Sequence, residues 1–166
     1  MKKILLVLGL VGVSFQASAA PLPYGIIGPS VFKSVNYPDR SIAINQNNEV
    51  MILDDAKIEQ KTFVARPGLA DRQCVTFYSK SKPNFVLRHQ GFHLKLQKIA
   101  RNRSFLEDAT FCPTPGLSKN KKANSVSFRS FNFPDRYIRH SGFRLFLHPY
   151  GGGVYLDDAT FNWVAK

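Results

Sequence analysis

The amino-acid sequence predicts an all-β fold built from three related units that close on one another. Each unit carries a phenylalanine, a serine two residues later and a proline four residues after that serine. The phenylalanines of this column are Phe32, Phe77 and Phe128, and the Thr-Phe pairs that end the units start at Thr62, Thr110 and Thr160. Apolar and polar residues alternate with a period of two, as in strands with one buried face. Repeats of this kind bury their apolar faces together, and closure removes exposed sheet edges.

The first nineteen residues are expected to be a signal peptide. Lys2 and Lys3 precede an apolar run over residues 4–13, and Ala17-Ser18-Ala19 has the pattern of a cleavage site. The apolar run is too short for a transmembrane helix, which needs about 20 residues. We therefore expect no membrane span, export to the periplasm or the extracellular space, and a mature domain over residues 20–166.

Turn residues divide that domain into units at about residues 30–73, 74–123 and 124–166. Gly, Pro, Asn and Asp separate the apolar runs and mark turns. Alternation predicts that one set of side chains in each run is buried; these are Phe92, Leu94 and Leu96 in the second unit and Phe143, Leu145 and Leu147 in the third. No segment after the signal peptide shows a helical period, so each unit is expected to hold about four short strands.

The chain contains two cysteines, Cys74 and Cys112. An exported protein meets oxidising conditions, in which an even number of cysteines indicates a disulfide. Cys74 precedes the first expected strand of the second unit and Cys112 follows the last. We therefore predict a disulfide across this unit, with free buried thiols as the alternative. Two cysteines without suitably spaced histidines indicate no structural metal site.

The formal net charge of +12 is concentrated in the middle of the chain. Ten Lys and Arg residues lie between Cys74 and Ser125, against only Glu107 and Asp108, whereas residues 20–73 hold six basic and six acidic residues. A basic excess favours anionic partners. A binder of lipopolysaccharide, acidic glycan or extracellular DNA is therefore an alternative function. Solvated loops are the simpler interpretation, and no nucleic-acid-binding motif is present.

Two strings in the third unit, NFPDRYIRHSGFRLFL and DDATF, resemble the AbfB domain, the carbohydrate-binding module family 42 of fungal and bacterial α-L-arabinofuranosidases. The resemblance covers essentially the whole mature chain and is weakest in the first unit. It implies a β-trefoil with threefold pseudosymmetry. It also implies one potential arabinofuranose pocket in each unit, formed by the His of the RH pair and the Asp of the DATF segment.

Carried over by position, the resemblance implies sugar-binding pairs at His89 and Asp108 in the second unit and at His140 and Asp158 in the third. An ionised carboxylate and a neutral imidazole together suit the hydroxyl groups of a furanose. Without the resemblance, each histidine could equally satisfy a backbone carbonyl, and each aspartate could cap a turn.

The first unit lacks this pair, because Ile44 and Gln60 occupy the two positions. Tyr137 precedes the histidine in the third unit, where the second unit has Val86. We therefore expect the third unit to carry the principal site, the second a weaker one and the first none. Tyr137 is interpreted either as a wall of the pocket or as a core residue.

No catalytic motif accompanies these residues. Glycosidases need two carboxylates flanking the scissile bond, but the acidic pairs Asp54-Asp55 and Asp157-Asp158 are adjacent, so their side chains are expected to diverge. The sequence also lacks serine-hydrolase and zinc-protease signatures. We predict a monomeric, stand-alone binding module that recognises arabinofuranose-containing polysaccharides without cofactor or metal. For a β-trefoil that binds a protein partner, a third class, the sequence offers no distinctive loop.

Overall fold

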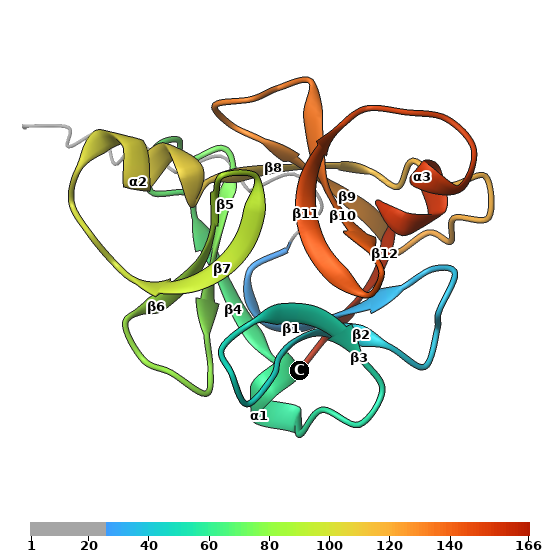
Figure 1. Cartoon of the computed structure of the whole chain (residues 1–166), viewed down its shortest axis with the longest axis horizontal. Coiled ribbons are helices and arrows are strands. Elements are labelled where there is room, and N and C mark those ends of the chain that lie inside the picture. Colours follow the sequence, from blue (N-terminus) through green and yellow to red (C-terminus); the bar gives the residue numbers. More distant parts are fainter. Residues whose placement is uncertain (1–25) are drawn as a thin grey trace, which may run out of the picture.

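A computed structural model of the chain describes residues 26–166, so the expected signal peptide lies outside the described residues. The described residues form a β-trefoil of twelve strands and three short helices. The same order of elements, three strands, a helix and a fourth strand, occurs three times. Figure 1 shows the three sets as lobes around a common centre.

The first set comprises β1 (Gly28–Ser34), β2 (Ser41–Ile44), β3 (Val50–Leu53), α1 (Ile58–Lys61) and β4 (Phe63–Pro67). The second comprises β5 (Val75–Ser79), β6 (Phe85–Gln90), β7 (His93–Lys98), α2 (Arg103–Asp108) and β8 (Phe111–Pro115). The third comprises β9 (Ser125–Ser130), β10 (Arg136–Ser141), β11 (Arg144–Pro149), α3 (Val154–Asp158) and β12 (Phe161–Ala165). We call these sets the first, second and third units; the exact limits of the sequence repeats stay a prediction.

Six strands, the first and last of each unit, close into a barrel. Every neighbour pair is antiparallel, in the order β1, β4, β5, β8, β9, β12 and back to β1. The remaining strands form three hairpins, β2–β3, β6–β7 and β10–β11, which pair with one another around one end of the barrel. Because each unit contributes to the barrel and to this hairpin layer, neighbouring units share long boundaries.

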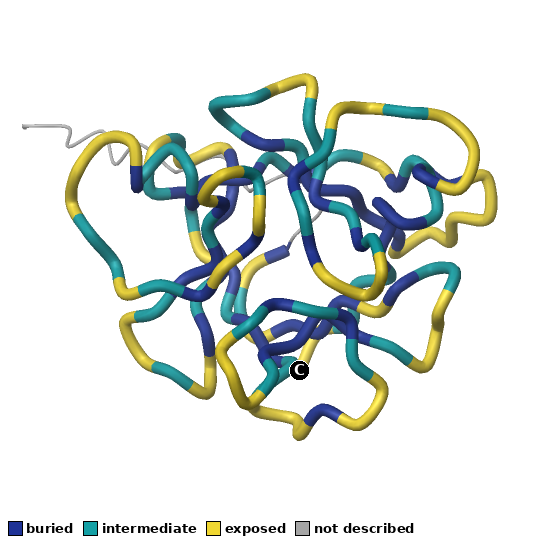
Figure 2. Tube along the Cα trace, in the orientation of Figure 1, coloured by how far each residue is buried: buried dark blue, intermediate teal, exposed yellow. Residues whose placement is uncertain are grey.

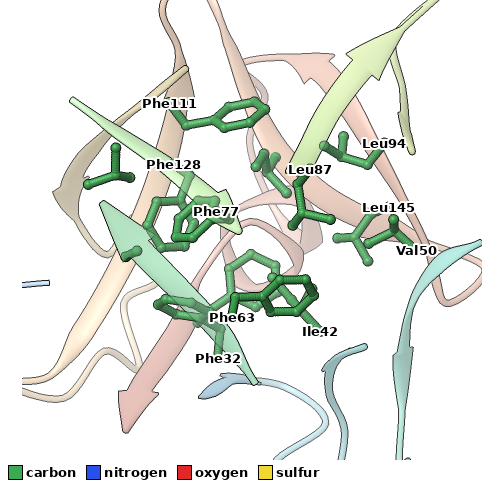
Figure 3. Packing of buried hydrophobic residues seen from close by; sticks show 14 of the residues in the cluster. Phe32, Ile42, Val50, Phe63, Phe77, Leu87, Leu94, Phe111, Phe128 and Leu145 are labelled. Atoms are coloured by element: carbon green, nitrogen blue, oxygen red, sulfur yellow. The ribbon is translucent and has the colours of Figure 1, made fainter. Parts of the chain in front are cut away.

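The core lies on the axis that the units share (Figure 3). Phe32, Phe77 and Phe128 meet there edge to face, with ring centroids 4.9–5.2 Å apart. The phenylalanines of the Thr-Phe pairs are also fully buried around this triad. Aromatic pairs of this geometry each contribute about 0.5–1.5 kcal/mol beyond their buried area. The recurring phenylalanines of the sequence are therefore the centre of the fold.

The sequence prediction that no helix follows the signal peptide is wrong. Each unit has one helix of four to six residues just before its last strand. These helices span little more than one turn, which is too short to show a 3.6-residue period. The side chain of Asn102 caps α2 by accepting a hydrogen bond from the amide of Phe105.

The expected burial of Phe143 is also wrong, since it is 36% exposed, whereas Phe92 is partly buried and packs against the core. Both residues lie in hairpin turns, with φ angles of 62° and 63°, directly after Gly91 and Gly142, which also have positive φ. Two consecutive positive φ angles define the tight turn that matches the twist of a hairpin. The strands therefore begin one residue later, and Leu94 and Leu145 provide the first buried side chains.

The predicted disulfide is confirmed. Cys74 immediately precedes β5, and Cys112 lies within β8 rather than after it, with the two Cα atoms 4.3 Å apart. The pairing of Val75 with Phe111 brings these strands together. The bond closes a loop with a sequence separation of 38 residues, which in the chain-entropy model stabilises a domain by roughly 3–4 kcal/mol.

Loops carry most of the exposed surface (Figure 2). The basic run Lys119–Lys122 lies in one such loop between β8 and β9 and is fully exposed. Across residues 26–166 the salt bridges use arginine or histidine and never lysine. Within the same range, no helix is long and apolar enough to cross a membrane.

Candidate functional site

The structure brings His140 and Asp158 together, as the resemblance to the AbfB domain implies. Strand alternation turns His140 of β10 inward beside Ile138, and Asp158 ends α3. The imidazole Nε2 lies 3.4 Å from a carboxylate oxygen of Asp158, and the two side chains are only 4% and 8% exposed. The pair therefore forms a nearly buried polar site.

A residue of the neighbouring unit completes this site. Asn36 follows β1 of the first unit, and its amide nitrogen donates to Asp158 Oδ1 at 2.8 Å. The amide oxygen of Asn36 lies 3.0 Å from His140 Nε2. The hydroxyl of Ser34 also donates to this oxygen, at 2.7 Å. The candidate site thus lies on the boundary between the third and first units, and one asparagine joins its two halves.

Arg139 holds the other oxygen of the carboxylate. Its side chain points to the opposite face of β10 from His140, and Nη2 donates to Asp158 Oδ2 at 2.6 Å. The Nε of Arg139 donates to the carbonyl of His140 at 3.0 Å. Because the guanidinium carries a permanent charge, its hydrogen bond to this oxygen is charge-assisted. The RH pair of the sequence therefore supplies both an imidazole and a fixed counter-ion.

The hydrogen-bond network assigns the proton of His140. Nε2 faces three acceptors, namely the amide oxygen of Asn36, the hydroxyl oxygen of Ser34 and a carboxylate oxygen of Asp158. Nε2 must therefore carry the hydrogen, which leaves the lone pair of a neutral ring on Nδ1. Burial has the largest effect on the pKa of His140 and lowers it. The charge of Asp158 raises this pKa, and the charge of Arg139 lowers it further. A neutral ring at neutral pH follows.

The hydrogen bonds of the His140 ring to described residues all use Nε2, so Nδ1 of the neutral ring can still accept one. A neutral Nδ1 and an ionised carboxylate both accept hydrogen bonds, so the site requires donors from its ligand.

The second unit has the same arrangement on its boundary with the third. His89 Nε2 lies 3.2 Å from Asp108 Oδ1, and Asn132 of the third unit bridges the two at 3.0 and 2.8 Å. Arg88 pairs with the second carboxylate oxygen at 3.1 Å. The Asp108 side chain is 15% exposed, nearly twice the value for Asp158.

The equivalent position of the first unit lacks the histidine, the aspartate, the arginine and the bridging asparagine of this arrangement and keeps only the serine, Ser79 of the second unit. Ile44 is buried, and the Gln60 side chain donates to the carbonyl of Ile44 at 3.2 Å. Ser81 of the second unit takes the position of the bridging asparagine and bonds to Ser79. A hollow of about 510 Å³ lies beside Gln60; Asp55 contributes a carboxylate to its lining, but no imidazole lines it.

Aromatic rings flank both histidines. Tyr37 and Phe143 lie edge to face, and Tyr37 contacts His140 with ring centroids 5.5 Å apart. Phe133 and Phe92 occupy the matching positions around His89. Tyr37 and Phe133, which each directly precede a proline, therefore pack on the histidine of the preceding unit. The hairpin phenylalanines that alternation assigned to the core belong to the rims of the candidate sites.

Tyr137 does not share a face with His140. It lies on the Arg139 side of β10, half-buried, with its ring centroid 6.3 Å from that of Tyr150. Tyr155 lies beneath Arg139, donates its hydroxyl to the carbonyl of His148, and has a pKa raised to about 12, mainly by burial. Tyr137 therefore belongs to a tyrosine cluster beside the His–Asp pair.

Sequence reasoning missed the bridging asparagines Asn36 and Asn132. The signal was present as a Ser-x-Asn column, which reads Ser-x-Ser at Ser79 in the second unit. Residues 26–166 contain no group of three or more His, Cys, Asp or Glu residues that could hold a metal ion. Each site therefore combines a histidine, an aspartate, an arginine and a bridging asparagine.

Comparison with known proteins identifies the family of the chain. The family model of the Alpha-L-arabinofuranosidase B (ABFB) domain matches residues 30–163. The chain belongs to this family. A probable alpha-L-arabinofuranosidase B of Aspergillus clavatus is 41% identical over 112 residues, which cover 64% of this chain and 21% of that protein. The chain thus spans about a fifth of the length of the curated relatives it matches.

Solved structures support the same assignment. An arabinofuranosidase complexed with arabinofuranosyl-alpha-1,2-xylobiose is similar, with a TM-score of 0.74 and 29% identity, covering 84% of this chain and 31% of that one. The designed threefold-symmetric protein ThreeFoil has a TM-score of 0.63 at 6% identity, covering 84% of this chain and 99% of that protein. The second similarity concerns the fold alone and supports the β-trefoil.

Proposed function

We propose that the chain is a secreted, non-catalytic carbohydrate-binding protein that recognises arabinofuranose side chains of glycans. The third unit would bind through His140 and Asp158, and the second through His89 and Asp108. One observation carries the proposal: each His–Asp pair is fixed by a neighbouring asparagine and arginine so that it offers acceptors to a ligand. Neutral sugars supply hydroxyl donors, whereas anionic groups supply more acceptors.

The expected affinity of one such site is modest. Hydrogen bonds to a charged group contribute about 1.5–3 kcal/mol each before ordering costs. A shallow site with one carboxylate and one imidazole should reach about −4 to −6 kcal/mol, or roughly millimolar to tens of micromolar dissociation constants. Two sites on one rigid domain would bind a branched polymer more tightly through multivalency. The domain is thus suited to polysaccharides with many side chains.

The relatives favour arabinofuranose as the sugar. The curated proteins that match are named as arabinofuranosidases, and one solved relative is complexed with arabinofuranosyl-alpha-1,2-xylobiose. The chain matches only about a fifth of such proteins, which supports a binding module rather than an enzyme. Asp157 also turns away from the site and accepts a hydrogen bond from Ser118. The third-unit site then has one carboxylate where a glycosidase needs two.

Export is supported by the disulfide, because such bonds persist in oxidising compartments. The signal-peptide pattern in residues 1–19 also supports export.

Binding to a glycan array at low and high salt tests the proposal. We expect retention on arabinan and arabinoxylan that changes little with salt, together with no hydrolysis of an aryl arabinofuranoside. Binding to lipopolysaccharide or DNA that falls steeply with salt, without retention on arabinan, would instead favour the exposed lysines as the binding surface. Turnover of the aryl arabinofuranoside would contradict the non-catalytic assignment.

A further inference from the structure

The second and third units place different residues at one equivalent surface position. Ile99 follows β7 and its amide donates to the carbonyl of Asn84; Tyr150 follows β11 and its amide donates to the carbonyl of Asp135. The strand registers agree, because Lys98 pairs with Phe85 and Pro149 pairs with Arg136. Ile99 and Tyr150 are therefore the same position in two copies of one scaffold.

The surroundings of this position differ sharply. In the second unit, Ile99 packs with Val86 and Phe105 in a small apolar cluster. In the third unit, tyrosines take all three positions: Tyr137 replaces Val86, Tyr155 replaces Phe105, and Tyr150 replaces Ile99. Tyr155 stays buried, whereas Tyr150 is 60% exposed. At this position the third unit therefore exposes an aromatic side chain, whereas the second unit packs an apolar side chain against its neighbours.

This tyrosine cluster adjoins the candidate sugar site. The Tyr150 ring lies 6.3 Å from that of Tyr137 and 6.0 Å from that of Tyr155. Arg139 lies 5.3 Å above the Tyr155 ring and donates to Asp158. Three contacts, through Tyr155 and Arg139, thus link Tyr150 to the carboxylate of Asp158.

Tyr150 is held well enough to act as a binding surface. Its backbone amide is bonded at 2.8 Å to Asp135, and a tyrosine ring has few rotatable bonds to immobilise. The exposed segment Gly152–Val154 follows it (Figure 2) and adds no large side chain over the ring except Val154, itself 66% exposed. An exposed aromatic ring is a surface on which the apolar C–H face of a sugar can stack.

We propose that Tyr150, supported by Tyr137, forms an extended subsite that stacks the sugar next to the arabinofuranose. The third unit then recognises an oligosaccharide, namely a side chain together with part of its backbone, whereas the second unit recognises the side chain alone. This inference rests on the proposed function, because the neighbouring pocket defines where the first sugar lies.

The test compares a one-sugar probe with a three-sugar probe. The Asp108→Asn background weakens the second unit about tenfold, and site-resolved signals report the third unit separately. Methyl α-L-arabinofuranoside and arabinofuranosyl-α-1,2-xylobiose are titrated against this protein by NMR. Tyr150→Ala is expected to weaken binding of the trisaccharide roughly three- to tenfold, the range for one aromatic contact, and to leave the furanoside unchanged. Tyr150→Phe should retain the trisaccharide, because the ring carries the contact.

Ile99→Ala, the same position in the second unit, is the matched control and should change the affinity for neither ligand. Equal weakening of both ligands by Tyr150→Ala would overturn the inference, since Tyr150 would then only support the furanose pocket. Unchanged trisaccharide binding would overturn it too. If the furanoside does not bind the protein with Tyr150 intact, the proposed function itself is wrong. This result differs from both outcomes described for Tyr150→Ala.

Discussion

Replacing Asp158 by asparagine removes one negative charge from the third-unit site and keeps the shape of the side chain. In the structure both carboxylate oxygens of Asp158 have partners, with Asn36 on Oδ1 and Arg139 on Oδ2. Each oxygen still has a second lone pair for a sugar hydroxyl. The amide would offer only one neutral acceptor and would point a donor toward Arg139 or the ligand.

The expected loss of affinity follows from the charge. A hydrogen bond to an ionised group contributes about 1.5–3 kcal/mol, against about 0.5–1.5 kcal/mol for a neutral one. Losing one charged acceptor should therefore weaken binding at the third unit about tenfold. The same substitution at Asp157, the preceding residue of α3, is the matched control, because its carboxylate bonds Ser118 instead of facing the site.

Stability must be measured beside affinity. Arg139 would lose its ion-pair partner, and its side chain is only 18% exposed. Leaving such a group unpaired costs about 1–3 kcal/mol, less than the 5–15 kcal/mol typical of whole domains. We therefore expect a lower melting temperature but a folded protein, checked by circular dichroism.

A site-resolved NMR titration with methyl α-L-arabinofuranoside gives the readout, since it measures millimolar dissociation constants in each unit separately. We expect Asp158→Asn to weaken the third site and leave the second unchanged. If Asp157→Asn and Asp158→Asn weaken binding equally, or if neither does, the assignment of the sugar site to this pair is wrong.

Three further predictions follow from the same geometry. Asn36→Ala should weaken the third-unit site about as much as Asp158→Asn, whereas Ser81→Ala should change no binding, as titrations of the two variants would show. Replacing Cys74 and Cys112 by alanine should lower the free energy of unfolding by roughly 3–4 kcal/mol in urea while sugar affinity of the folded protein persists; an unchanged urea midpoint would contradict this. Burial lowers the pKa of His140, so its contribution to stability is complete above about pH 6.5 and is lost as the pH falls toward the lowered value. Wild type should therefore lose more stability than His140→Gln between pH 7 and 5, and equal losses would contradict the buried neutral ring.

The sequence predicts those features that recur in every unit or that pair locally. The Phe32, Phe77 and Phe128 column is the core triad of the structure, and the His–Asp pairs of two units come together as expected. Period and spacing carry this information because they reflect burial on one face of a strand.

The features that sequence reasoning missed depend on contacts between units or on single turns. Asn36 lies 104 residues from His140, and only the closure of the trefoil brings the last unit beside the first. Phe143 follows the alternation of its strand, yet the backbone of a two-residue turn sets its direction. The one-turn helices are defined by local caps, which no period reveals.

A crystal structure of the protein soaked in methyl α-L-arabinofuranoside tests the central claim most directly. The account predicts furanose density within hydrogen-bonding distance of the Asp158 and Asp108 carboxylates, each beside its histidine, and no sugar beside Gln60. Density beside Gln60, or only on the exposed lysine loop at residues 119–122, would contradict it.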